Sequence, residues 1–281
     1  MNQNTMLKKR FVNLACGSSY VRDTEWTNLD YVPSDQSVRQ ADLLGKLPFD
    51  NETVDVIYCS HFLEHIPRQQ VHHFLGECLR VLKPSGIARF VLPDFEEMCN
   101  EYLHQLSQND YAKASFLMLS MLDQLVRLRP GGQLGEFYRH LQADSENEEM
   151  TSYVLERTGE TIEVGRSASL PGGSVWVRLL RNPRKLWARI ERRYCRMLSL
   201  LFPAAFRQQN ISFAGTGERH QWVYDYYSFD RLLRHNGFAS VERMSSSTSS
   251  IAGFPFYPLD LTVDRRPRKG SESMYVEATK S

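Results

Sequence analysis

The sequence predicts an α/β fold with a mostly parallel sheet and a large helical insertion before its last helix and strands. Residues 11–94 alternate short apolar runs with turn signals, whereas residues 95–216 lose that rhythm and contain helix-length segments. The strand pattern returns after residue 217. Strands separated by helix-length segments favour a parallel sheet covered on both faces. We therefore divide the chain into 1–94, 95–216 and 217–281.

The first part contains five apolar runs and one amphipathic run. The amphipathic run, residues 68–82, places its apolar side chains on one stripe and predicts a helix that ends at Pro84 and Gly86. The apolar runs are rich in β-branched residues or end at turn signals, as strands do. They predict strands at 11–15, 26–31, 38–42, 54–60 and 87–92.

The later parts predict mainly helices, followed by two strands. An acidic stretch at 144–149 separates the helices of the insertion, and a loop rich in Gly, Ser and Pro follows at 165–174. Ser228 is expected to be the N-cap of a helix that runs to residue 236 and ends at Gly237. The other expected elements are helices at 95–107, 111–128 and 183–201 and strands at 239–244 and 274–278.

Composition sets broad limits on function. The chain has 281 residues, 42% of them hydrophobic and 24% charged, and a net charge of +1, so no global field attracts nucleic acid or membrane. It has five cysteines, an odd number without a CxxC pair, which favours a reducing compartment and a cytoplasmic protein. We expect no metal site, because no Cys/His set has ligand spacing.

Two strand ends suggest a nucleotide site. A glycine in the turn after the first strand, Gly17, lets backbone approach a ligand at the carboxyl edge of the sheet. The second strand ends in Asp30, whose carboxylate could accept hydrogen bonds from two ribose hydroxyls. Taken alone, each feature is weak, and an acid at a strand end is more often a turn former.

Together with other motifs these features resemble the class I methyltransferases that use S-adenosylmethionine. Residues 13–17 (NLACG) resemble their first motif, usually NLGCG, and residues 28–30 (NLD) resemble the second. Further matches follow in order and at the family's spacing, at 41–57, 63–66 (LEHI) and 77–86 (ECLRVLKPSG). The resemblance implies a Rossmann-like fold with an antiparallel final strand, and S-adenosylmethionine as the cofactor.

The resemblance also implies which residues bind the cofactor. Asp30, with Tyr31 beside it, would bind the ribose, Asp42 the adenine amino group, and the Leu43 N–H the adenine ring. The remaining residues would lie along the methionine part and beneath the sulfonium; they are Ala15, Cys16, Gly17, Ser60 and His61.

The chain departs from the family pattern at two places. Ala15 stands where glycine is usual, which is tolerable if its φ is negative. Only nine residues separate Gly17 from Thr27, too few for the usual long first helix. The methionine end of the site is therefore expected to be more open, or covered by the insertion.

The candidate catalytic residues are His220 and Asp94, because an alcohol acceptor needs a base to remove its proton. His220 lies among aromatic residues that suit either a core or a sugar-stacking surface. Asp94 can equally be the N-cap of the helix after it. Glu64 and His65 can act in catalysis or simply cap and pack the segment after the fourth strand.

The acceptor is expected to be a small molecule or a glycan. No Asn/Asp-Pro-Pro-Tyr tetrapeptide follows the fourth strand, which favours an oxygen over a nitrogen acceptor. Residues 220–225 (HQWVYD) and 231–238 are similar to a subgroup of predicted methyltransferases associated with surface-glycan biosynthesis. We therefore expect O-methylation of a sugar, glycan or related molecule; the alternatives are an RNA or protein methyltransferase and a non-catalytic S-adenosylmethionine-binding protein.

Residues 176–207 carry nine Lys and Arg residues, one acid and many apolar side chains. A basic amphipathic helix with Trp residues suits peripheral contact with an anionic membrane. A solvated basic face fits equally well, and a nucleic-acid surface is the least favoured of the three because the overall charge is nearly neutral.

Overall fold

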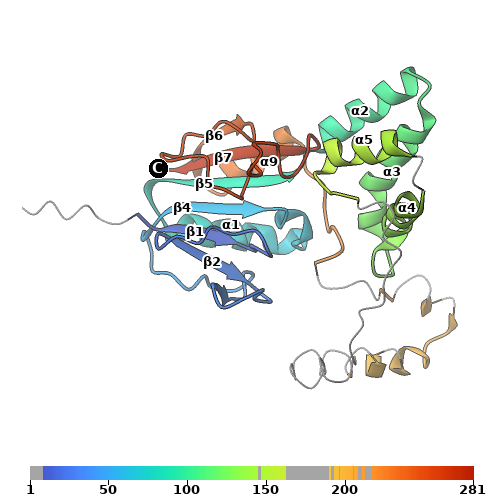
Figure 1. Cartoon of the computed structure of the whole chain (residues 1–281). Coiled ribbons are helices and arrows are strands. Elements are labelled where there is room, and N and C mark those ends of the chain that lie inside the picture. The colour runs from blue at the N-terminus through green and yellow to red at the C-terminus, as the bar shows by residue number, and fades with distance from the viewer. Residues whose placement is uncertain are drawn as a thin grey trace, which may run out of the picture.

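The fold is a seven-stranded sheet with a helical unit at one edge, seen in a computed structural model (Figure 1). The structure describes residues 9–144, 147–162, 190, 193–195, 197–204, 206–207, 211–212 and 217–281. The strands lie in the order β3-β2-β1-β4-β5-β7-β6. Their bounds are Phe11–Leu14 (β1), Trp26–Asp30 (β2), Val38–Gln40 (β3), Val54–Ser60 (β4), Leu82–Pro93 (β5), Phe238–Met244 (β6) and Ser273–Lys280 (β7).

Strands β1 to β5 pair in parallel, and β7 is antiparallel to both β5 and β6. The chain moves from β1 outward through β2 to β3, and then returns to the other side of β1 at β4. In open parallel sheets, ligands bind outside the carboxyl ends of the strands where the order reverses. That position here lies between the ends of β1 and β4.

Two helices cover one face of the sheet: α1 (Arg68–Val81) and α9 (Tyr226–His235). Alternate strand residues point to opposite faces, and Ile57 and Cys59 of β4 point to this one. They belong to the same buried cluster as Phe74 of α1 and Phe229 of α9. This cluster is the main hydrophobic core.

Among the described residues, the second face is covered by the chain between β6 and β7 and not by a helix. Ile251 and Leu259 pack against Val56 and Tyr58, the β4 residues of opposite alternation. The Phe256 ring lies edge-on to Trp26, with ring centroids 5.2 Å apart. Both faces are therefore covered, as the sequence predicts, although on this face the cover is an extended aromatic segment.

A buried arginine fixes that segment to the sheet. Arg89 of β5 is 1% exposed and donates to Asp260 Oδ2 at 3.0 Å and to Glu277 Oε1 at 2.7 Å. Its guanidinium also donates to the carbonyl oxygens of Ser245 and Thr248. The Arg89 side chain thus pairs with both buried carboxylates and also holds the backbone of the segment between β6 and β7.

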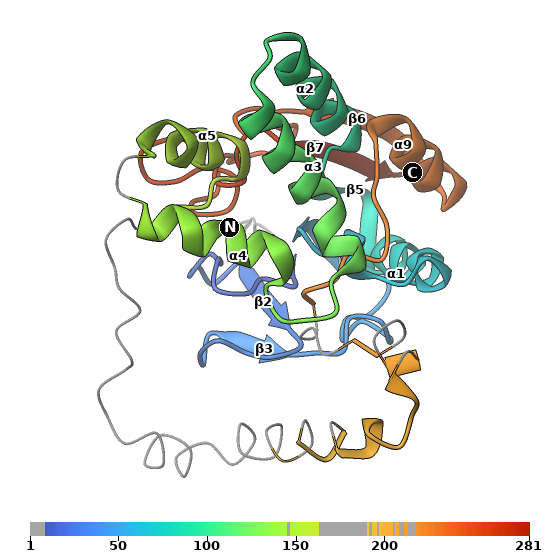
Figure 2. The ribbon, with the colours of Figure 1, turned by 90° about the vertical axis from the view of Figure 1, so that its right-hand side faces the viewer.

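The helical unit stands at the carboxyl edge of the parallel strands, beyond their arrowheads in Figure 1 and in front of the sheet in Figure 2. Phe116, Leu134, Leu141 and Val154 form its own buried cluster, separate from the sheet's core. Its helices are α2 (Phe95–Ser107), α3 (Tyr111–Val126), α4 (Gly132–Ala143) and α5 (Glu148–Thr158).

The predicted fold class is confirmed, with corrections to individual elements. The N-cap of α9 is Asp225 and not Ser228, whose N–H donates to Asp225 Oδ1 at 2.6 Å. The acidic stretch opens α5, since Glu148 and Glu149 lie in its first turn, where acids interact well with the helix dipole. No helix occurs between β1 and β2, as the short spacing predicts.

Most of the basic segment 176–207 and of the predicted helix 183–201 lies outside the described residues. Membrane contact through this segment stays a prediction. Among the described residues, no helix has both the length and the apolar character that a membrane span requires.

Candidate active site

The turn after β1 is tied to the end of β2. The Cys16 N–H donates to the Leu29 carbonyl at 3.1 Å, and the Gly17 N–H donates to Asp30 Oδ2 at 2.8 Å. Gly17 has φ +55°, and a Cβ there would meet no atom within 4 Å. Space is therefore left for a ligand above the turn, and the Asp30 carboxylate lies beside it.

Ala15 has φ +53°, so the condition under which alanine is tolerable at this position, a negative φ, is not met. The left-handed region costs an L residue about 1–2 kcal/mol, which explains why glycine suits this position. The neighbouring Cys16 side chain is buried, and burial raises the pKa of its thiol to about 12. Cys16 thus stays a neutral thiol and offers its backbone to the turn.

Ala15→Gly is expected to raise the free energy of unfolding by up to about 1 kcal/mol. The gain from relieving the left-handed alanine exceeds the extra entropy of glycine in the unfolded chain, about 0.4–1 kcal/mol. Urea titration measures the change in the free energy of unfolding. The matched control, Ala112→Gly on the exposed side of α3, should destabilise by up to about 1 kcal/mol. A lower free energy of unfolding in Ala15→Gly than in the wild type would contradict the conclusion that Ala15 is strained.

The other predicted nucleotide-binding residues follow β2 and β3. Asp30 is half-buried; Tyr31 is 59% exposed. Asp42 is exposed and accepts the Leu44 N–H on Oδ1 at 3.0 Å, while Leu43 is buried. The Ala41 N–H donates to the Asp30 carbonyl, so these two loops are linked at the same edge of the sheet.

Ser60 and His61 stand at the end of β4, on the other side of the switch point. His61 has φ +51°, its N–H donates to the Val91 carbonyl at 2.8 Å, and its Nε2 lies 3.0 Å from Ser273 Oγ. Burial holds the pKa of His61 well below its usual value, which keeps the ring neutral. The Ser60 hydroxyl has no partner among the described residues.

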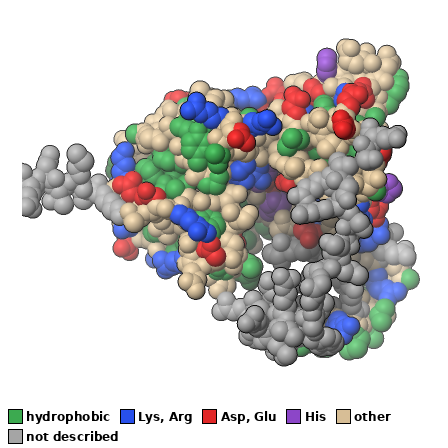
Figure 3. Space-filling model, viewed as in Figure 1, with side chains coloured by type: hydrophobic (Ala, Val, Ile, Leu, Met, Phe, Trp, Pro, Cys, Tyr) green, Lys and Arg blue, Asp and Glu red, His purple; other side chains and the backbone are tan. Residues whose placement is uncertain are grey.

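A cavity of about 470 Å³ adjoins this edge, between the sheet and the helical unit. Figure 3 shows histidine and basic side chains at this junction. It is lined by polar side chains from β4, the helical unit and the segments before α9 and β7; they include His61, His65, Arg127, His220, Lys269 and Glu272. Its aromatic lining residue is Tyr138 of α4.

The two candidate catalytic residues lie in different surroundings. His220 is 8% exposed and lines the cavity, and burial lowers its pKa to about 3. Asp94 does not line it: Oδ1 accepts the Glu97 N–H as the N-cap of α2, and Oδ2 pairs with Arg243. A capping role accounts for Asp94. Trp222, from the aromatic group near His220, stacks under the Arg68 guanidinium at 4.1 Å and does not line the cavity.

Sequence reasoning missed Glu272 and Lys269, the charged residues just before β7. Because β7 is antiparallel, its first residue lies at the carboxyl edge of the other strands. The Glu272 N–H donates to the Arg157 carbonyl, and its own carbonyl accepts the Asp94 N–H at 2.8 Å. The expected antiparallel final strand was the signal that could have identified them.

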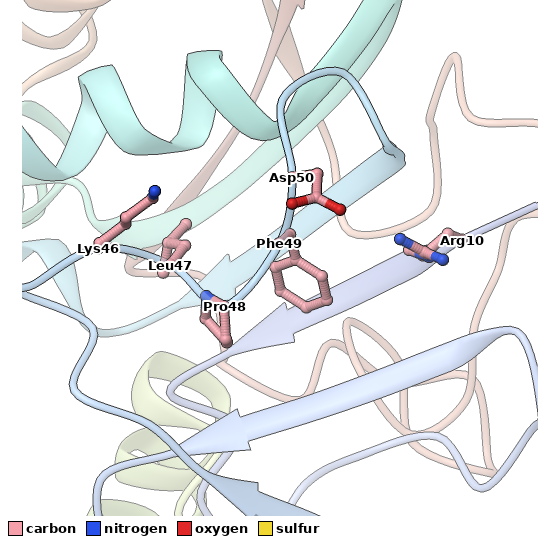
Figure 4. Close-up of a pocket in the computed structure, with 6 residues that line it drawn as sticks. All are labelled: Arg10, Lys46, Leu47, Pro48, Phe49 and Asp50. Carbon is pink, nitrogen blue, oxygen red and sulfur yellow. The ribbon is translucent and has the colours of Figure 1, made fainter.

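A second cavity, of about 340 Å³, lies at the amino-terminal edge of the sheet (Figure 4). Its lining comes from the residue before β1 and the loop before β4: Arg10, Lys46, Leu47, Pro48, Phe49 and Asp50. It is at the opposite end of the strands from Gly17 and Asp30, so it takes no part in the site described above.

Comparison with known proteins agrees with this geometry. Residues 14–90 match the family model described as a methyltransferase domain, which spans the Gly17 turn, Asp30 and His61. No curated protein matches the chain. The match and the switch-point geometry identify the cofactor as S-adenosylmethionine.

Several solved structures resemble the chain along most of its length. A chain of the complex between the Haloferax volcanii Trm112 methyltransferase activator and a putative methyltransferase has 13% identity and a TM-score of 0.38, over 97% of this chain and 82% of that one. An S-adenosylmethionine-dependent methyltransferase from Archaeoglobus fulgidus has 10% identity and a TM-score of 0.38, over 97% and 86%. A possible histamine N-methyltransferase from Thermotoga maritima has 11% identity and a TM-score of 0.36, over 97% and 82%.

Proposed function

We propose that this S-adenosylmethionine-dependent methyltransferase transfers the methyl group to a hydroxyl oxygen of a sugar, glycan or related small molecule. The observation that carries the proposal is the cavity beside His61, which many hydrogen-bonding side chains line. The expected sulfonium position, beneath which Ser60 and His61 lie, borders this cavity, so a bound acceptor would face the methyl group. Methyl transfer is an in-line displacement, for which such positioning supplies most of the rate.

The size and lining of the cavity favour a small polar acceptor. Its volume of about 470 Å³ falls in the range of small-molecule sites, about 300–1,000 Å³. Hydrogen-bonding side chains enter it from several sides, which suits a molecule with many hydroxyl groups. An RNA or protein acceptor, the alternative, requires a surface that admits a chain. Contact of segment 176–207 with an anionic membrane, which would bring a lipid-linked glycan to the cavity, remains part of the proposal.

Glu272 is the best-placed proton acceptor for the hydroxyl. It lines the cavity, is 9% exposed, and its Oε2 has no partner among the described residues. Burial raises the pKa of Glu272 to about 7, with the nearby Arg157 opposing the rise. A base whose pKa lies near the working pH is the most effective general base.

The test is an assay of S-adenosylhomocysteine release with free monosaccharides, nucleotide-activated sugars, RNA and peptides as acceptors, followed by mass spectrometry of the product. Release with a sugar, and a methyl group on its oxygen, is the expected result. Release only with RNA or peptides would overturn the proposal in favour of the alternative.

Glu272→Gln should lower kcat by about 100-fold with the sugar acceptor, the low end of general-base contributions, and leave S-adenosylmethionine affinity unchanged. Glu242→Gln, at an exposed position of β6, is the matched control and should retain wild-type kcat. Equal kcat values for the two variants would remove Glu272 from the proposed chemistry.

A further inference from the structure

Three side chains that can ligate a metal converge at the rim of the cavity. One carboxylate oxygen of Glu64 and one ring nitrogen each of His65 and His220 lie within 4.8 Å of one another. Ligands on neighbouring positions of a zinc ion with bonds of about 2.0–2.2 Å are about 3–3.6 Å apart. Inward movement by about 1 Å would therefore complete the site.

Backbone hydrogen bonds hold the two parts of this cluster together. Glu64 and His65 belong to the short 3₁₀ helix Leu63–His65 after β4, and His220 comes from the segment before α9. The Glu64 carbonyl accepts the Gln221 N–H at 2.6 Å and the Trp222 N–H at 3.3 Å, and the His220 N–H donates to the Gln124 carbonyl. The spacing of the three residues is thus fixed by main chain.

The His65 ring is oriented as that of a metal ligand is. The His65 Nδ1 lies 2.9 Å from the Arg219 carbonyl oxygen, so Nδ1 carries the proton and Nε2 keeps its lone pair. Metal-ligating histidines commonly donate their other ring N–H to a backbone carbonyl in this way. The rings of His65 and His220 stand edge-to-face with centroids 4.8 Å apart, and both line the cavity.

Of the three residues, Glu64 gains the most from a bound cation, because its carboxylate is buried. It is 1% exposed, and neither carboxylate oxygen has a hydrogen-bond partner among the described residues. The His61 Nδ1 is 3.4 Å from Oε1, longer than an ordinary N–H···O hydrogen bond. A buried polar group without a partner costs about 1–3 kcal/mol, and a bound cation would remove that cost.

Nearby positive charges work against a dication, but weakly. Arg127 lines the same cavity, and its charge is paired with Asp123 at 2.6 Å. Lys269 also lines it, and burial lowers the pKa of its ammonium group.

We propose that Glu64, His65 and His220 bind a divalent transition-metal ion of the Zn²⁺ type at the rim of the cavity. Two imidazole nitrogens and one carboxylate are a set that zinc and its neighbours prefer, whereas magnesium and calcium select oxygen ligands. Three protein ligands leave a coordination position open, as in catalytic zinc sites. The sequence prediction of no metal considered ligands close in sequence, and His220 lies far from the other two.

The open position would take an oxygen of the acceptor. A hydroxyl bound to a dication loses its proton more readily, and expansion to five-coordinate geometry would let a sugar diol chelate through two oxygens. This use of the metal rests on the proposed function, whereas the binding itself does not. His220 then acts as a ligand and not as the base, and Glu272 remains the proton acceptor.

The test is metal binding by tag-free protein without cofactor or acceptor. Zn²⁺ is titrated calorimetrically, and Co²⁺ by its visible absorption. We expect one ion per chain, and about 100-fold weaker binding or more in Glu64→Gln, His65→Gln and His220→Gln, since even the partners that support a metal ligand are each worth 10–100-fold in affinity. His73→Gln, on the exposed side of α1, is the matched control and should bind like wild type.

S-adenosylmethionine affinity and the far-ultraviolet circular dichroism of each variant separate lost ligands from lost folding. Glu64→Gln keeps the shape of the side chain and is expected to fold. Failure of the wild type to bind Zn²⁺ and Co²⁺, or equal binding by all four variants, would overturn the metal site. Neither result affects methyl transfer to sugars, and a failure of the acceptor assay leaves the metal titration intact.

Discussion

Asp30→Ala is expected to weaken S-adenosylmethionine binding by about 1,000-fold. Two ribose hydroxyls donating to one carboxylate contribute about 2 kcal/mol each, and about 1.4 kcal/mol corresponds to a factor of ten. The substitution also removes the acceptor of the Gly17 N–H, which lies 2.8 Å from Oδ2, and so releases the turn that we expect to line the cofactor. Calorimetric titration with S-adenosylmethionine and S-adenosylhomocysteine measures the loss.

Two variants separate these contributions. Asp30→Asn retains an oxygen for the Gly17 N–H but loses the charge, so it should bind more tightly than Asp30→Ala and less tightly than wild type. Asp50→Ala removes an exposed carboxylate at the opposite edge of the sheet and should leave the affinity unchanged. Undiminished binding by Asp30→Ala would remove Asp30 from the cofactor site.

Arg89→Met is expected to lower the free energy of unfolding by about 3–5 kcal/mol. Its two carboxylate partners, Asp260 and Glu277, are each 3% exposed and would be left buried without their cation. Urea denaturation followed by tryptophan fluorescence is a suitable measurement, because Trp26 packs against Phe256 of the segment that Arg89 holds.

Neutralising Asp260 and Glu277 tests whether their unpaired buried charges cause the loss of stability in Arg89→Met. The triple variant with Arg89→Met, Asp260→Asn and Glu277→Gln carries no buried unpaired charge and should recover part of the loss. Arg234→Met breaks an ion pair with Asp230 on the surface of α9, where Arg234 is 49% exposed, and should cost less than about 1 kcal/mol. A smaller loss of unfolding free energy in Arg89→Met than in Arg234→Met would contradict the stabilising role of Arg89.

The sheet and the cofactor turn could be predicted because their signals are local. Buried parallel strands are apolar along their length, so β1 and β4 stand out as runs; Gly17 lies in the turn after β1, and Asp30 is the last residue of β2. The conformation of Ala15 could not be read in the same way. Residue type suggests negative φ, whereas the turn requires a positive one.

The cavity could be predicted only in part, because distant segments build it. His220 was identified from its own surroundings, but its approach to Glu64 depends on backbone hydrogen bonds between two segments far apart in sequence. Glu272 required the direction of the last strand. Helix α5 was missed because the acidic stretch 144–149 was expected to separate helices, whereas Glu148 and Glu149 lie in the first turn of α5.

The chain between β6 and β7 has two roles, one in folding and one in the cavity. Its first part seals a sheet face through Arg89, and its last residues bring Lys269 and Glu272 to the cavity. A change there that alters the acceptor also endangers folding. Helices α3 and α4 pack around their own cluster and contribute part of the remaining wall, including Tyr138. With the acceptor in this cavity, as we propose, changes of specificity are expected to be tolerated best in these two helices, and libraries that aim to change specificity should begin there.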